Sequence, residues 1–151
     1  MPDRKHLAEQ LQELVQICRD GQDGYRDGAE HAKDAGLKRL LNEVSLERAK
    51  FAGDLEREAV RWGKPDVDRS GTVHGAVQRG WASLKAALGG GDDAILSSLE
   101  AGDEFARQHY DEAIKDERMP AEIVGILRNQ AQAIVGTLDR IRALRRNHRA
   151  A

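Results

Sequence analysis

The sequence has few of the residues on which several classes of protein depend. It contains one cysteine and three prolines among 151 residues, and aromatic residues make up only 4% of it. The single cysteine, Cys18, excludes an internal disulfide framework and agrees with a reducing compartment. With so few aromatic residues, the remaining apolar content favours helices that pack along aliphatic seams.

The chain also lacks an excess of one charge and a long apolar run. Its 24 basic and 26 acidic residues leave a net charge of −2, which suggests neither a nucleic-acid nor a membrane partner. No stretch approaches the roughly 20 apolar residues of a membrane span, and the first residues lack the apolar core of a signal peptide. We therefore expect a cytoplasmic protein with one domain over residues 1–151 and no membrane partner.

Apolar residues recur at spacings of three and four in four long segments, as they do in amphipathic helices. The spacing predicts helices over about residues 3–33, 37–62, 92–116 and 120–147. The first helix is predicted to run through Gly21–Gly28, where inward glycines would let a neighbour come close; a break near Gly21–Gly24 is the alternative. Gly36 is expected to form a left-handed turn after the first helix, and Gly63 and Pro65 to end the second.

The lengths of the connections predict the topology. Short turns join the first helix to the second and the third to the fourth, so each pair should form an antiparallel hairpin. About 29 residues separate the two hairpins, and they include a short helix with Val73, Val77, Trp81, Leu84 and Leu88 on one side. The predicted fold is therefore all-α, a ferritin-like four-helix bundle whose hairpins are joined by one long crossover. An up-down-up-down bundle with a decorated loop is the alternative.

Four segments carry a resemblance to a known family. Residues 20–34, 45–65, 70–88 and 92–114 resemble a bacterial ferritin-like family of four-helix-bundle proteins of unknown function, and the tract HGAVQRGWASLKAAL is the most specific part. The resemblance implies the ferritin-like topology. It implies no activity and no catalytic residues.

The motif of an ordinary di-iron site is absent from the sequence. Ferritin-like di-metal centres use Glu-x-x-His pairs, whose spacing places a carboxylate and an imidazole on one helical face, and no glutamate here has a histidine three residues later. A degenerate site would use Glu47, Asp103 and Gln130 near mid-bundle. Buried carboxylates need a partner, and Arg48 or Arg107 could supply it. We expect no metal, cofactor or catalytic site; the alternative is a carboxylate-type site for iron or manganese.

Other motifs are weaker. Residues 66–71 match the opening of an EF-hand loop, but the twelfth position is Val77 instead of the bidentate glutamate that Ca²⁺ needs. Cys18 is expected to be a small core residue. The five histidines are spread along the chain, and none forms an i, i+4 pair with another, so a zinc motif is not supported.

The fourth helix ends in a run of arginines. This run suits the negative end of a helix dipole, and nucleic-acid binding through it is a further alternative. Its members are Arg140, Arg142, Arg145, Arg146 and Arg149.

These observations lead to a functional hypothesis without a catalytic role. We expect a non-catalytic binding or structural protein and hypothesise a stress-related role. The alternatives are the carboxylate-type metal protein and a nucleic-acid-associated stress protein. The apolar stripe around Trp81 either covers the protein's own bundle, which we favour for most of it, or forms a homodimer.

Overall fold

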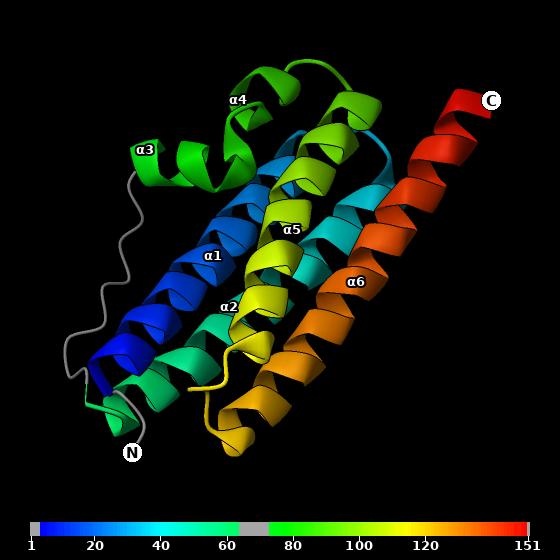
Figure 1. Ribbon diagram of the computed structural model, residues 1–151. Helices are drawn as coiled ribbons and strands as arrows, with labels where there is room; N and C mark the ends of the chain where they lie inside the picture. Colours follow the sequence, from blue (N-terminus) through cyan, green and yellow to red (C-terminus); the bar gives the residue numbers. More distant parts are fainter. Residues whose placement is uncertain (1–3, 64–72, 151) are drawn as a thin grey trace.

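A computed structural model describes residues 4–63 and 73–150 of the chain. The described part is helical and contains no strand. Four long helices lie side by side as a bundle: α1 (Arg4–His31), α2 (Ala35–Arg61), α5 (Asp92–Lys115) and α6 (Ala121–Ala150) (Figure 1). The predicted all-α class and the four long helices are thus confirmed. None of the helices in the described ranges is long and apolar enough to cross a membrane.

α1 and α2 form an antiparallel hairpin with a turn that differs from the predicted one. α1 continues through Gly21 and Gly28 without a break, as expected. However, Gly36 lies inside α2, and its φ is not positive. The chain turns earlier because Asp34 caps α2, where its carboxylate accepts a hydrogen bond from the Leu37 amide at 2.8 Å. The prediction of a left-handed Gly36 was therefore wrong.

The remaining boundaries lie close to the predicted ones. α2 ends at Arg61, and Gly63 follows with a φ of 107°, the left-handed conformation that favours glycine after a helix. α6 begins directly after Pro120, whose carbonyl accepts the first helical hydrogen bond from Val124 at 3.0 Å. α5 and α6 form the second antiparallel hairpin (Figure 1).

The described part of the connection between the hairpins is not one short helix. It consists of α3 (Val73–Ala76), the π-helical turn η1 (Val77–Trp81) and α4 (Leu84–Ala87). The predicted single stripe is interrupted because Gly80 has a φ of 97°, which no helix accommodates. The EF-hand-like residues 66–71 lie outside the described residues.

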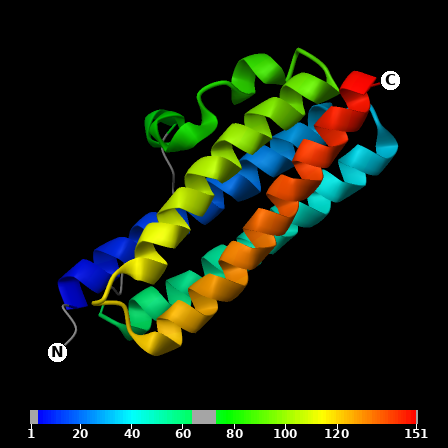
Figure 2. The same cartoon turned by 45° about the vertical axis from the view of Figure 1, so that its right-hand side comes forward.

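The two hairpins are arranged so that α2 and α5 run in the same direction. α2 ends at the end of the bundle where α1 begins, whereas α5 begins at the opposite end (Figures 1 and 2). η1 and α4 pack on α5, and η1 also contacts α1, so this segment lies over the seam between α1 and α5. The seam between α2 and α6 lies on the other side of the bundle (Figure 2).

The interior consists of two apolar clusters with a polar layer between them. One cluster contains Leu11, Leu55, Tyr110 and Leu127. The other contains Leu41, Ile95 and Leu99 near the ends where α2 and α5 begin. At the level that separates them, Arg48 of α2 and Asp103 of α5 are 1% and 0% exposed. A functional site in the bundle interior would therefore lie in this polar layer at mid-bundle.

Candidate functional site

The three candidate ligands for a degenerate metal site do not come together. Asp103 and Gln130 are both buried, whereas Glu47 is only half-buried and lines a groove between α2 and α6. Asp103 is bound to Arg48 and Tyr25, and Gln130 is bound to Tyr110. Across the two described ranges, no three His, Cys, Asp or Glu side chains are grouped so that they could hold a metal ion.

The centre of the polar layer is a two-pronged ion pair. Nη1 and Nη2 of Arg48 donate hydrogen bonds to the two carboxylate oxygens of Asp103, at 2.5 and 2.8 Å. The Tyr25 hydroxyl donates a third hydrogen bond to the same carboxylate. The guanidinium carbon of Arg48 also lies 5.1 Å from the centre of the Tyr25 ring, within range of a cation–π contact. Of the two neutralising residues predicted, Arg48 takes this role, and Arg107 instead pairs with Glu104 and Asp111.

A glycine on α1 makes room for the buried arginine. A Cβ atom at Gly21 would lie 3.1 Å from Nη1 of Arg48, closer than almost all real contacts of this kind. Alanine at this position would therefore press on the guanidinium that holds Asp103. The glycine has a packing reason that outweighs its cost of about 1 kcal/mol inside a helix.

The electrostatics of the cluster keep the arginine charged and the tyrosine neutral. Burial works to lower the pKa of Arg48, but the charge of Asp103 and its hydrogen bonds outweigh burial and raise that pKa above its ordinary value. Burial, together with the negative charge of Asp103, raises the pKa of Tyr25 well above its ordinary value. The cluster is therefore an internally neutral pair of charges with a neutral phenol as hydrogen-bond donor.

A second polar cluster lies below the first and is uncharged. The Tyr110 hydroxyl donates to Oε1 of Gln130 at 2.7 Å, and Gln130 in turn donates weakly to the Phe51 carbonyl at 3.5 Å. Sγ of Cys18 lies 3.0 Å from the Tyr110 oxygen. Burial raises the pKa of Cys18 to about 11, which keeps it a thiol at neutral pH. Cys18 is thus a buried core residue, as predicted, and Gln130 is a hydrogen-bond partner of Tyr110.

Trp81 fills the seam between α1 and α5 above the ion pair. A Cβ atom at Gly24 of α1 or at Gly102 of α5 would come within 2.4 Å of the indole, so the two glycines form the slot that holds it. The Trp81 ring meets Tyr25 edge to face, with ring centres 6.4 Å apart. The indole is only 7% exposed. Trp81 therefore covers its own bundle, as we favoured, and a homodimer through this face would not have the indole as a contact.

An ion pair fastens the same segment to α1. Nη2 of Arg79 lies 2.9 Å from Oδ1 of Asp20, and Nε of Arg79 contacts the other oxygen. Asp20 is 6% exposed, and burial, opposed by Arg79, raises its pKa above the ordinary value. Neither this pair nor the Trp81 slot was predicted, because both join segments far apart in the sequence.

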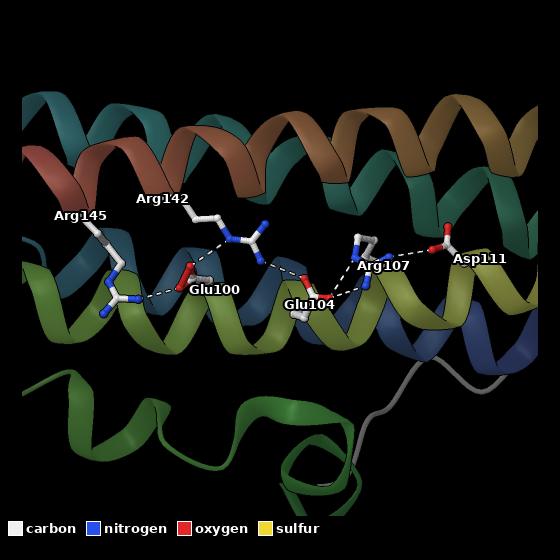
Figure 3. Close-up of polar contacts among 6 residues, drawn as sticks. All are labelled: Glu100, Glu104, Arg107, Asp111, Arg142 and Arg145. Carbon is white, nitrogen blue, oxygen red and sulfur yellow. Dashed lines mark hydrogen bonds and ion pairs between the residues drawn. The ribbon is translucent and has the colours of Figure 1, made fainter.

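The arginine-rich end of α6 is partly neutralised by α5 (Figure 3). Arg142 donates to Glu100 at 3.1 Å and to Glu104 at 3.0 Å, and Arg145 donates to Glu100 at 2.6 Å. Glu104 also binds Arg107, and this contact and Arg142 lower the pKa of Glu104. Of the arginine run that was expected to complement the helix dipole, Arg142 and Arg145 therefore form a ladder of ion pairs that joins α5 to α6.

The fold and these contacts define a class of protein: an all-helical bundle whose central polar side chains form hydrogen bonds and an ion pair with one another. Its central carboxylate is held by Arg48 and Tyr25, and its central seam is covered by Trp81. The chain belongs to the family described as a domain of unknown function (DUF2383), whose pattern matches residues 6–116. None of the curated proteins is significantly similar to the chain.

Proposed function

We propose that the protein is a ferritin-like four-helix bundle that acts as a non-catalytic binding or structural protein. The topology supports the first part: two antiparallel hairpins, with α2 and α5 running in the same direction, are the arrangement of bundles with one long crossover. The matched family carries no stated activity that would argue against the second part.

The observation that carries the proposal is the position of Arg48. Ferritin-like metalloproteins direct carboxylates and imidazoles from all four helices toward two metal ions in the bundle core. Here both oxygens of the inward-facing Asp103 carboxylate already accept hydrogen bonds from the Arg48 guanidinium. A metal ion at this level would lie beside a buried cation, and like charges in a poorly solvated interior repel strongly. The residues present therefore do not fit a di-metal centre.

The ion pairs on α6 weigh against the nucleic-acid alternative. Arg142 and Arg145 each have a carboxylate partner on α5, so a phosphate would have to compete with Glu100 for both. Phosphate binding draws its affinity from cations that are free to replace condensed counterions. The proposal of a protein-binding or structural role is favoured for this reason.

Metal content measured in solution tests the proposal. The protein, purified without chelators, is incubated with Fe²⁺, Mn²⁺ or Zn²⁺, passed through a desalting column and analysed for metal per chain. We expect no stoichiometric metal, and the same result for Glu47→Ala and for the shape-conserving Asp103→Asn. About two ions per chain in the unaltered protein, lost in either variant while the helical circular-dichroism signal is retained, would overturn the proposal.

A further inference from the structure

The two seams between the hairpins differ in how they are filled. The seam between α1 and α5 is covered by the protein's own η1, with Trp81 wedged between Gly24 and Gly102. The seam between α2 and α6 has no such cover among the described residues. These two helices meet through Gln130 and Phe51 and through Arg61 and the first turn of α6. Beyond those contacts, toward the start of α2, a groove of about 280 Å³ lies between them.

The groove has an apolar floor and walls of opposite charge. Leu41, Val44 and Ile141 line its floor. Glu43 and Glu47 stand one turn apart on the α2 wall, and Arg140 stands on the α6 wall. These three charged side chains make no ion pair or hydrogen bond with another described residue, and they do not pair with each other. The neighbouring seam, between α5 and α6, is instead closed by ion pairs (Figure 3).

We propose that the α2–α6 groove is the interface of a symmetric homodimer, with a second copy of this chain as the occupant. The two charged walls decide the symmetry. A two-fold axis parallel to the groove places α2 of one copy opposite α6 of the other at the same height. Glu43 and Glu47 then face the partner's Arg140, and the same contact recurs on the other side of the axis. An axis across the groove would instead oppose glutamate to glutamate, which like-charge repulsion disfavours.

Two further features of this face favour a second copy. Leu46 of α2, three residues from Glu43, is 73% exposed and adds apolar surface beside the acidic wall. On α6, Ala133 and Gly136 line the groove, and a Cβ atom at Gly136 would meet nothing within 4 Å, so a neighbouring helix can approach closely. A face about 40 Å long and about 20 Å wide across two packed helices covers about 800 Å² per copy, the size of a standard interface.

This inference deepens the proposed function by naming the partner, and its test is independent of metal content. Sedimentation equilibrium of the full chain at several concentrations should give twice the mass of one chain. Arg140→Glu alone, or Glu43→Lys with Glu47→Lys, should weaken association at least tenfold. Combining all three substitutions should restore the dimer, because the exchanged charges face each other again across the axis.

Matched controls separate the groove from general charge effects. Arg146→Glu changes the net charge as Arg140→Glu does but lies outside the groove. Glu112→Lys, on the exposed face of α5, changes the net charge in the opposite direction and is the control for the Glu43→Lys and Glu47→Lys substitutions. Neither should alter the mass. A monomer at all concentrations would overturn the proposal, as would a dimer that the groove variants leave intact or that the combined variant does not restore. If the groove instead binds a small molecule or another protein, sedimentation equilibrium should give the mass of one chain.

Discussion

Removal of the Arg48 side-chain charge should expose how much the buried ion pair contributes. Arg48→Met keeps much of the side-chain volume but leaves the Asp103 carboxylate buried with only the Tyr25 hydroxyl as a partner. Loss of one member of a buried pair costs about 3–5 kcal/mol, because the remaining charge is uncompensated. The matched control is Arg57→Met: Arg57 is 74% exposed in its pair with Asp54, and an exposed pair contributes about 0–1 kcal/mol.

A double variant separates the charge from the packing. In Arg48→Met combined with Asp103→Leu, no buried charge remains, so part of the lost stability should return. The Tyr25 hydroxyl then lacks its acceptor, which costs about 1–3 kcal/mol, and the double variant should stay below the unaltered protein. Urea unfolding followed by circular dichroism measures all four proteins. With a slope of about 2 kcal/mol per molar, the midpoint of Arg48→Met should fall by about 2 M.

The pH dependence of the single variant provides a second readout. In Arg48→Met, the folded state holds a proton on the unpaired Asp103 more tightly than the unfolded state does, so stability falls as the pH rises and returns on acidification. The difference in urea midpoint between this variant and the unaltered protein should therefore be smaller at pH 5 than at pH 7. A midpoint within 0.5 M of the unaltered protein, or a gap that widens at low pH, would refute the role assigned to the pair.

Three further predictions concern packing, reactivity and capping. Gly102→Ala should destabilise the protein by about 1–3 kcal/mol, because the added methyl group overpacks against Trp81. Gly125→Ala should stabilise it by about 0.5–1 kcal/mol, because a Cβ atom there has no neighbour within 4 Å. Urea midpoints that shift in the same direction in the two variants would contradict this. Because burial raises the pKa of Cys18 to about 11, a thiol reagent at pH 7.5 should label it only after unfolding, and stoichiometric labelling of the folded chain would contradict its burial. Asp34→Ala should cost about 1 kcal/mol by removing the cap of α2, and a thermal midpoint equal to that of the unaltered protein would show that the cap is dispensable.

The long helices were predictable because their apolar periodicity is strong and local. The spacing of three and four identified all four helices, and Gly63 marked the end of α2 correctly. The prediction of the turn before α2 was wrong because it relied on Gly36 as the residue that ends the turn, whereas the capping carboxylate of Asp34 places the start of the helix earlier. The sequence carries a local signal at both ends of α2. At the start of this helix, however, two signals compete, Gly36 and the capping carboxylate of Asp34.

The candidate site was only half predictable from the sequence. Asp103 on an inward face required a partner, and that argument correctly included Arg48. Arg48 and Arg107 could not be distinguished as the partner before the structure was known, because the choice depends on which face of α2 meets α5. The contacts of Trp81 with Gly24 and Gly102 join three segments that are far apart in the sequence, so no local pattern predicted them.

A crystal structure of the protein grown with Mn²⁺ tests the central claim most directly. An anomalous difference map recorded from such a crystal would locate any bound ion at mid-bundle. We predict both guanidinium nitrogens of Arg48 on the Asp103 carboxylate, as in Nη1–Oδ1 at 2.5 Å, and no anomalous peak beside that carboxylate. Two strong peaks between α2 and α5, with Arg48 displaced from Asp103, would contradict the account.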